Sequence, residues 1–356
     1  MQVISLNAPS MASKIYIGKD VMQTRLPALT NGVKCFVVTD SNVHALYRDF
    51  FAQYFQGAEI FVLSAGEEYK NFASLQTILE RMSAAGLHRT SRLFAVGGGV
   101  VGDIGGLAAA LYMRGISCVQ IPTTLLAQID SSVGGKTAID LGGVKNVVGA
   151  FYQPQEVLVD PTFLQTLPAR EIKCGLGEMV KYAALNIEIF HSLEKGFDAL
   201  EELIGACIAH KARVVEQDEK EAGERKSLNV GHTTGHAIEL TSGLSHGECV
   251  LYGTWLETDM AIAAGVCEKE YGARLLAILK RALKVEPVSA LDLSNVKAFA
   301  GKAKSDKKNV EDDKIVMSVA KNKNEWTIWA LPFEEYVAAL EKAVLALKRE
   351  GQVCDQ

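Results

Sequence analysis

The chain has 356 residues, of which 48% are hydrophobic and 22% charged, a composition typical of a globular protein large enough for two domains. Its net charge of −5 argues against a general nucleic-acid binder. The sequence contains no uncharged apolar run of about 18 residues, so no membrane-spanning helix is expected. The seven cysteines are scattered and form no Cys-x-x-Cys pair, which is typical of buried thiols in a reducing compartment and predicts a cytoplasmic protein. No signal peptide is expected either.

Short apolar segments alternate with helix-like segments up to about residue 165. They are rich in β-branched residues, and several are apolar on both faces, which indicates the strands of a covered parallel sheet. The predicted strands are Lys14–Ile17, Cys35–Thr39, Ile60–Leu63, Leu93–Val96, Cys118–Ile121 and Val157–Val159. The sequence therefore predicts a Rossmann-like α/β domain over residues 1–165, with ligands at the carboxyl ends of its strands.

The rest of the chain has a helical pattern. Apolar residues recur with a helical period over residues 200–215 and again over residues 336–347. A β-hairpin is predicted where Ile315–Val319 and Trp326–Trp329 flank a short polar turn. We therefore expect a mostly α-helical second domain over residues 166–356.

A glycine-rich turn follows one of the predicted strands. Gly97, Gly99 and Gly102 match Gly-x-Gly-x-x-Gly, a pattern in which the backbone can approach a pyrophosphate at the start of a helix. A tight structural turn is the alternative, and the acidic residue expected about 20 positions later has no clear equivalent. Asp40 and Asn42, which follow an earlier strand, are either ribose or adenine contacts or residues of a strand-to-helix turn.

A second glycine-rich segment, Ser131–Thr137, resembles a nucleotide-triphosphate loop at first sight. The first glycine of that pattern would fall on Asp130, so the match fails. Lys136 amid glycines, and Lys145 with Asn146 just downstream, nevertheless suit a substrate that carries a phosphate or carboxylate group. The alternative interpretation is that each of these lysines is a solvated charge on the protein surface.

Three of the seven histidines lie close together in the sequence. His232 and His236 are four positions apart and so share one face of a helix, and His246 follows ten residues later. Imidazole is the commonest metal ligand and the usual proton shuttle near neutral pH. The segment predicts either a metal or acid–base site or a structural cluster of hydrogen-bonded histidines.

Seven ordered blocks of the sequence, spread through nearly the whole chain, resemble the 3-dehydroquinate synthase family of the sugar-phosphate cyclases. The blocks are Gly97–Asp103, Leu111–Gly115, Ile121–Thr137, Lys145–Pro154, Gly177–Lys181, Leu228–His236 and His246–Glu248. The resemblance implies an N-terminal NAD-binding domain, a C-terminal helical metal domain and a homodimer. The sequence departs from the usual family pattern at Cys249–Thr254, directly after Glu248. These positions are expected to contribute to helix packing, so the difference is not expected to alter the chemistry.

The resemblance also implies a reaction, the conversion of 3-deoxy-D-arabino-heptulosonate 7-phosphate to 3-dehydroquinate and phosphate in the shikimate pathway. The steps would be transient oxidation by NAD+, phosphate elimination, reduction and intramolecular aldol closure. Zinc, replaceable by cobalt, would be the metal. The implied partners are this small sugar phosphate and a second copy of the chain, with neither nucleic acid nor membrane.

Site residues are carried over from the family position by position. The implied metal ligands are Glu178, His232 and His246. The implied NAD contacts are Asp40, Asn42, Glu67, Lys70, Gly98, Gly99, Asp103, Thr123, Thr124, Lys136 and Lys145. The implied catalytic residues are Asp130, Lys136, Lys181, Arg225, Asn229 and His236. The implied substrate contacts include Lys145, Asn146 and Lys307, with Lys308 as an alternative to Lys307, and Arg114 would reach the phosphate bound by the neighbouring subunit.

Other functions remain open at this point. A sibling cyclase that makes an inosose or a valiolone would share the cofactor, the metal and the early steps. A metal-dependent polyol dehydrogenase would instead release NADH in every turnover. A phosphoryl-transfer enzyme is disfavoured by Asp130, and a non-enzymatic binding module is disfavoured because the polar and glycine-rich segments fit one chemistry.

Overall fold

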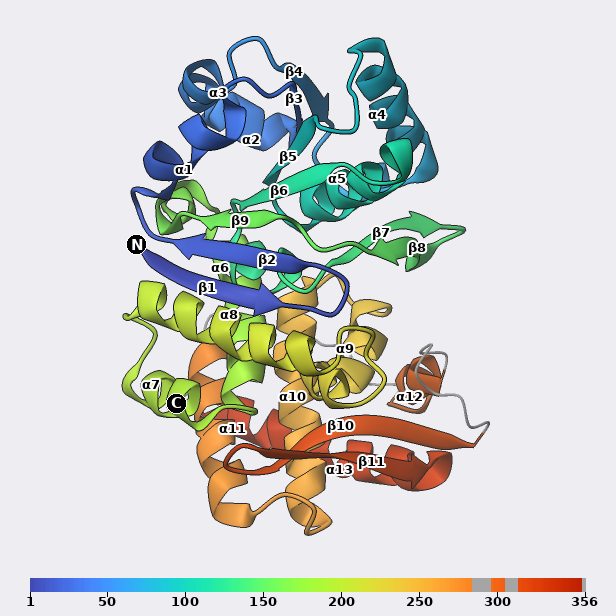
Figure 1. Ribbon diagram of the computed structural model, residues 1–356. Coiled ribbons are helices and arrows are strands. Elements are labelled where there is room, and N and C mark those ends of the chain that lie inside the picture. Colours follow the sequence, from blue (N-terminus) through green and yellow to red (C-terminus); the bar gives the residue numbers. More distant parts are fainter. Residues whose placement is uncertain (284–295, 305–312, 354–356) are drawn as a thin grey trace. The chain divides into compact units, whose positions relative to one another are not determined.

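The structure is a computed structural model that describes residues 1–283, 296–304 and 313–353 (Figure 1). The chain forms two compact units, each discontinuous in sequence. The first consists of Met1–Ile172 and Ile204–Lys220, and the second of Lys173–Leu203 and Glu221–Gln356. The domain boundary predicted between residues 165 and 166 does not include the return of Ile204–Lys220 to the first unit.

The first unit is built on a seven-stranded sheet with the strand order β1-β2-β9-β6-β5-β3-β4. Its strands are β1 (Gln2–Asn7), β2 (Ala12–Ile17), β3 (Cys35–Asp40), β4 (Glu59–Leu63), β5 (Arg92–Gly97), β6 (Ser117–Pro122) and β9 (Glu156–Val159). All neighbouring pairs are parallel except β1 and β2. The six predicted strands are confirmed, and β1 was not predicted.

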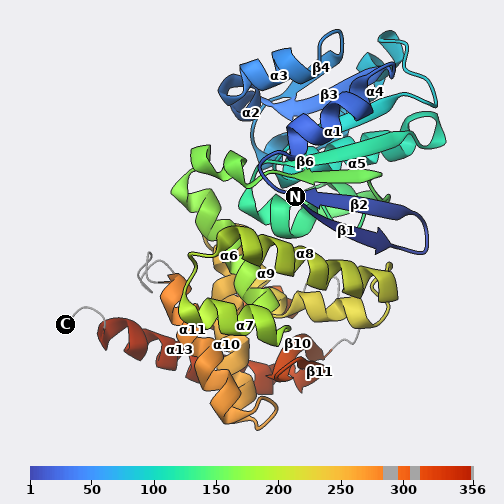
Figure 2. The ribbon, with the colours of Figure 1, turned by 60° about the vertical axis from the view of Figure 1, so that its left-hand side comes forward.

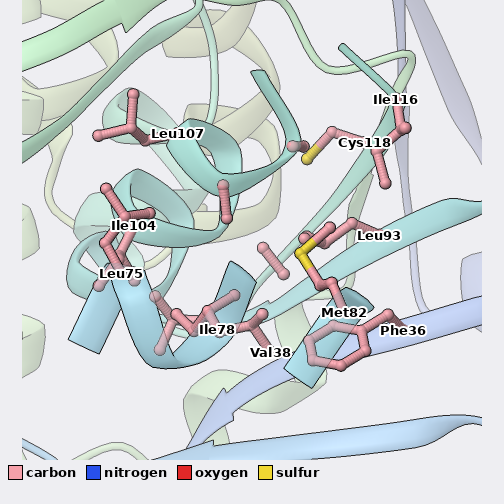
Figure 3. Close-up of a cluster of buried hydrophobic side chains, with 14 of the residues drawn as sticks. Phe36, Val38, Leu75, Ile78, Met82, Leu93, Ile104, Leu107, Ile116 and Cys118 are labelled. Carbon is pink, nitrogen blue, oxygen red and sulfur yellow. The ribbon is translucent and has the colours of Figure 1, made fainter. Parts of the chain in front are cut away.

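Helices cover both faces of this sheet because its central strands are apolar on both sides. The helices are α1 (Val21–Thr30), α2 (Ser41–Leu46), α3 (Arg48–Tyr54), α4 (Phe72–Ala84) and α5 (Gly99–Leu111). Phe36 and Val38 of β3 belong to a core cluster with side chains of α4 and α5, such as Ile78 and Ile104 (Figure 3). Val37 between them belongs to a second cluster with α1 and α3, as the period-two alternation of a strand requires.

The strand order reverses between β3 and β5. The chain leaves β3 for β4 on one side and returns to β5 on the other. At such a switch point the connections diverge, and ligands of open α/β sheets bind there, beyond the carboxyl ends of the strands. Asp40 ends β3 and Gly97 ends β5, so both predicted cofactor segments begin at this point of the sheet.

Two further segments complete the first unit. An antiparallel hairpin, β7 (Lys136–Leu141) and β8 (Val144–Phe151), packs against α5. Helix α8 (Leu200–Gln217) runs beside β1 in both views (Figure 1, Figure 2). The Asn7 backbone N–H donates to Glu216 over 2.6 Å, and that of Ser10 donates to Glu219 over 3.0 Å. Short helical turns are η1 (Glu67–Tyr69), η2 (Tyr112–Arg114), the π-helical η3 (Ala127–Ser131) and η4 (Pro161–Thr166).

The second unit is mostly helical, as predicted, and its described elements surround helix α10. The helices are α6 (Ala169–Ala183), which begins in the first unit, α7 (Ile187–Lys195), η5 (Glu224–Asn229), α9 (His232–Glu239), α10 (His246–Ala263), α11 (Lys269–Leu283), α12 (Val296–Lys304) and α13 (Phe333–Val353). Helix α10 is buried on nearly every side and packs against α9, α11 and α13. The predicted hairpin is confirmed as β10 (Lys314–Asn322) and β11 (Glu325–Pro332).

Across residues 1–283, 296–304 and 313–353, none of the helices combines the length and the apolar character needed to cross a bilayer.

Candidate cofactor and metal site

The glycine-rich turn lies where the sequence analysis expects it, between β5 and the first turn of α5. Gly98 is the residue before the helix, and a β-carbon there would lie 2.9 Å from the Thr124 methyl carbon. The Thr123 N–H donates to the Gly97 carbonyl over 3.0 Å, which holds the end of β6 beside this turn. Glycine therefore permits the two connections to touch, and it leaves the N–H groups of α5 accessible to an anion.

The Asp40 carboxylate begins helix α2. It accepts hydrogen bonds from the backbone N–H of Asn42 at 2.8 Å and of Val43 at 3.0 Å. These bonds satisfy two donors that the first turn of a helix otherwise leaves unpaired. The strand-to-helix turn considered for these residues is thus present, at the switch point of the sheet.

Lys70 connects several residues predicted to bind cofactor or substrate. Its ammonium lies 2.6 Å from the Asp103 carboxylate, 3.6 Å from that of Glu67 and 2.5 Å from the Asn146 amide oxygen. Burial raises the pKa of Asp103 to about 6, although the Lys70 ammonium opposes the shift. Asn146 adopts a left-handed backbone conformation, with φ at 53°. The structure therefore joins α5 and the β7–β8 hairpin through one buried lysine.

Asp130 lies in the π-helical turn η3, a rare conformation that is frequent at functional sites. Lys211 of α8 forms an ion pair with its carboxylate and also donates to its backbone carbonyl over 2.7 Å. Sequence reasoning did not select Lys211, because a lysine in a predicted helix gives no local signal of its partner.

The two lysines of the β7–β8 hairpin are exposed and lie at different ends of it. Lys136 starts β7 opposite Phe151, whereas Lys145 lies beside the glycine turn that joins Leu141 to Val144. Each strand rises by about 3.4 Å per residue, so the length of the hairpin separates the two lysines by too much for one phosphate group to contact both. They are therefore suited to separate charged groups of a ligand.

Glu178, His232, His236 and His246 come together within the second unit. The Glu178 Oε1 atom lies 3.1 Å from Nε2 of His246 and 3.5 Å from Nε2 of His232. One ligand atom from each of the three imidazoles lies within 4.8 Å of the others. A carboxylate with two or three imidazoles is the donor set of a catalytic zinc site, so these residues fit the predicted metal.

Neighbouring groups orient this donor set. The His232 Nδ1 atom bonds the Val230 carbonyl at 3.1 Å, which directs Nε2 toward Glu178. The second oxygen of Glu178 pairs with the buried Lys181 ammonium. Burial alone would lower the pKa of His246, but hydrogen bonds with Glu178 and Glu239 outweigh it and raise that pKa to about 9. An imidazole this close to two carboxylates attracts a cation, whether a proton or a metal ion.

Backbone contacts between helices bring the donors together. A β-carbon on Gly177 would lie 2.0 Å from the Gly247 carbonyl oxygen, and one on Gly247 would lie 1.8 Å from the Cys174 carbonyl oxygen. Helices α6 and α10 therefore cross in direct backbone contact. Because Gly177 precedes Glu178 and Gly247 follows His246, this crossing sets the carboxylate beside the imidazole.

A buried carboxylate of α10 fixes the start of α9. Glu257 accepts from the backbone N–H of Gly231 at 3.0 Å and from that of Thr234 at 2.8 Å. A negative charge at a helix N-terminus pairs with its free N–H groups and its dipole. The position of His232, the first residue of α9, thus depends on α10.

Two of the remaining predicted residues lie in or beside η5. Arg225 is one of the largest fully buried side chains, and the Asn229 amide donates to Glu221 over 2.6 Å. Lys307 and Lys308 lie outside the described residues.

Comparisons with known proteins show the family of the chain. The family model for the N-terminal part of 3-dehydroquinate synthase matches residues 60–174, and that for the C-terminal part matches residues 175–309. The chain belongs to the 3-dehydroquinate synthase family. A 3-dehydroquinate synthase of Clostridium acetobutylicum is 42% identical over 79% of this chain and 84% of its own length. One of Rhodospirillum rubrum is 38% identical over 97% of this chain and 95% of its own.

Solved structures of other sugar-phosphate cyclases share the fold. A 2-deoxy-scyllo-inosose synthase complexed with carbaglucose-6-phosphate, NAD+ and Co2+ has a TM-score of 0.83 at 25% identity, covering 96% of this chain and 99% of its own. A 2-epi-5-epi-valiolone synthase from Streptomyces hygroscopicus with NAD+ and Zn2+ bound has a TM-score of 0.81 at 26% identity, covering 98% and 100%. The predicted fold class is therefore confirmed.

Proposed function

We propose that the protein is a 3-dehydroquinate synthase that converts 3-deoxy-D-arabino-heptulosonate 7-phosphate to 3-dehydroquinate and phosphate in the shikimate pathway, with NAD+ and Zn2+ or Co2+ as cofactors. The observation that carries the proposal is the 42% identity to a 3-dehydroquinate synthase, against 25–26% to the inosose and valiolone synthases of the same fold. Cytoplasmic location is part of the same proposal and rests on the cysteine usage.

The two cofactors have matching places in the chain. NAD+ would bind the Rossmann-like part predicted for residues 1–165, with its pyrophosphate at the Gly98–Gly99 turn, and the metal would bind Glu178, His232 and His246. When bound, NAD+ would supply reversible hydride transfer and the metal would supply Lewis acidity at the substrate hydroxyls.

The chain's own residues hold the anionic substrate and move protons. Lys136, Lys181 and Arg225 supply positive charge for the phosphate and carboxylate groups, together with Lys145 and Lys307. His236 lies beside the metal donors, where a proton carrier is needed next to a polarised hydroxyl. Asp130, with Lys211 paired to it, and Asn229 orient hydroxyl groups by hydrogen bonds.

Replacing Lys136 by alanine is expected to lower kcat/KM by about 10- to 100-fold, because a hydrogen bond to a charged group is worth about 1.5–3 kcal/mol. Initial rates over a range of substrate concentrations measure the loss. Lys14→Ala removes another exposed strand lysine of the first unit and serves as the matched control, with unchanged kinetics. An unchanged kcat/KM in Lys136→Ala would remove Lys136 from the site.

The proposal includes a homodimer in which Arg114 serves the partner's site. Arg114 is exposed and left-handed, with φ at 67°, and it follows Met113, which is also left-handed, with φ at 52°. Two such residues in succession store strain, which is frequent where a side chain must be presented to a ligand. The exposed side chains of Leu111 and Met113 beside it offer apolar surface to a second copy.

Mixing two inactive variants tests this assembly. Arg114→Ala and His232→Ala proteins, allowed to exchange subunits, should regain up to about a quarter of wild-type activity, because half of the dimers are mixed and each holds one intact site. Light scattering on a sizing column should show a dimer. A monomer in solution, or no recovery after demonstrated exchange, would overturn the shared site.

The overall activity is tested with zinc-loaded protein, the heptulosonate phosphate and a catalytic amount of NAD+. Phosphate and 3-dehydroquinate should form together over many turnovers per NAD+ molecule. Phosphate released from another sugar phosphate, without 3-dehydroquinate, would identify a sibling cyclase, and accumulation of NADH would identify a dehydrogenase.

A further inference from the structure

One carboxylate outside the proposed donor set contacts an imidazole within it. Glu239 is the last residue of α9, and its Oε2 atom lies 3.0 Å from Nδ1 of His246 at the start of α10. The other ring nitrogen, Nε2, faces Glu178 at 3.1 Å. The imidazole thus lies between two carboxylates that meet opposite edges of the ring.

This contact decides which nitrogen of His246 is available. The Glu239 carboxylate accepts a hydrogen bond from Nδ1–H, so the nitrogen that a metal ion would take in place of a proton is Nε2, on the side of Glu178. His232 is arranged in the same way, with Nδ1 bonded to the Val230 carbonyl at 3.1 Å. Two independent acceptors therefore direct two Nε2 atoms toward the same carboxylate.

We infer that Glu239 is a positioning residue for the metal site, which holds His246 in the Nδ1–H tautomer with Nε2 directed at the ion. The inference rests on the proposed function, because it takes His246 as a metal ligand. A carboxylate that orients a metal-bound histidine typically changes metal affinity by about 10- to 100-fold when it is removed.

The position of Glu239 in its helix supports this role over a structural one. Glu239 follows His232 by seven residues and His236 by three, so all three side chains share one face of α9. A negative charge at the C-terminal end of a helix opposes the helix dipole. The dipole of its own helix therefore does not account for a carboxylate at this position, whereas the contact with His246 does give it a favourable interaction.

Zinc affinity of the metal-free protein, measured by competition with a chromogenic chelator, tests the inference. Glu239→Ala should bind Zn2+ about 10- to 100-fold more weakly than the wild type. Glu239→Gln should retain most of the affinity, because its amide oxygen can still accept the Nδ1–H bond. Thermal unfolding of both metal-free variants, compared with that of the metal-free wild type, shows that each of them folds.

Glu194→Gln is the matched control, since it removes the same charge from a partly exposed cluster with Arg274 and His191 in the second unit, none of which belongs to the proposed donor set. It should bind zinc as the wild type does. If Glu239→Ala does not fold, Glu239→Asp, whose shorter side chain withdraws from Nδ1, replaces it with the same expected direction of change.

The outcomes separate this inference from the proposed function. A wild-type protein that binds no zinc would refute the metal site itself. If the wild type binds zinc and Glu239→Ala binds it with the same affinity, only the role of Glu239 is overturned. Equal losses in the glutamine and alanine variants would make Glu239 a direct ligand instead, and would overturn the positioning role as well.

Discussion

Replacing His232 by alanine is expected to abolish tight zinc binding and to lower turnover by at least about 10³-fold. A metal acting as a Lewis acid contributes several kcal/mol to a transition state, and each 1.36 kcal/mol is a factor of ten in rate. The loss is expected to be this large because His232, Glu178 and His246 lie within one donor set, so the remaining donors hold the ion weakly. Metal content by mass spectrometry and steady-state rates measure the two effects.

His191→Ala is the control for this experiment. His191 is an exposed histidine of the same unit whose nearest charged partner is Glu194 at 3.1 Å, and such surface pairs contribute about 0–1 kcal/mol. It should retain its metal and its activity. Full activity of His232→Ala with no bound metal would falsify the ligand assignment.

Replacing Gly247 by alanine is expected to have a similarly large effect through packing. The new methyl group would lie 1.8 Å from the Cys174 carbonyl oxygen, and this neighbour is helix backbone that cannot rotate away. Overpacking of this kind costs about 1–3 kcal/mol of unfolding free energy, and we expect the upper end of that range. Because α6 and α10 must then move apart, Glu178 should leave His246 and zinc affinity should fall as well.

Thermal unfolding and the zinc competition assay measure these two losses. Gly243→Ala is the matched control, because a β-carbon at Gly243 meets nothing within 4 Å and the residue lies just before the same helix. Its stability and zinc affinity should equal those of the wild type. If Gly247→Ala kept the wild-type melting temperature, the direct crossing of the two helices would not be what builds the donor set.

Much of the fold follows from local patterns in the sequence. The strands β3, β5 and β6 are short, apolar and rich in β-branched residues, so burial between two layers of helices is their expected state. The β10–β11 hairpin was equally clear from its paired apolar runs. The β7–β8 hairpin was not predicted, because the glycines and lysines around Lys136 and Lys145 suggested a ligand-binding loop.

The candidate site was less accessible to such reasoning. The helical spacing of His232 and His236 indicates a shared face, and Glu239 continues that face, so its spacing could have drawn attention to it. Glu178 and Lys211 carry no comparable signal, since a charged residue in a helix usually faces water. Their partners are set by helix crossings and by the return of α8 to β1, which depend on packing between distant segments.

The discontinuous first unit has a consequence for the order in which the chain can fold during synthesis. Its sheet strands end at Val159, yet Glu216 and Glu219, which accept bonds from the β1–β2 hairpin, are made much later. A nascent chain released only as far as residue 172 lacks both carboxylates, so the backbone donors of Asn7 and Ser10 have not yet gained these acceptors. Cotranslational folding of the first unit must therefore either wait for residues 204–220 or leave the β1–β2 hairpin without these bonds until that segment is made.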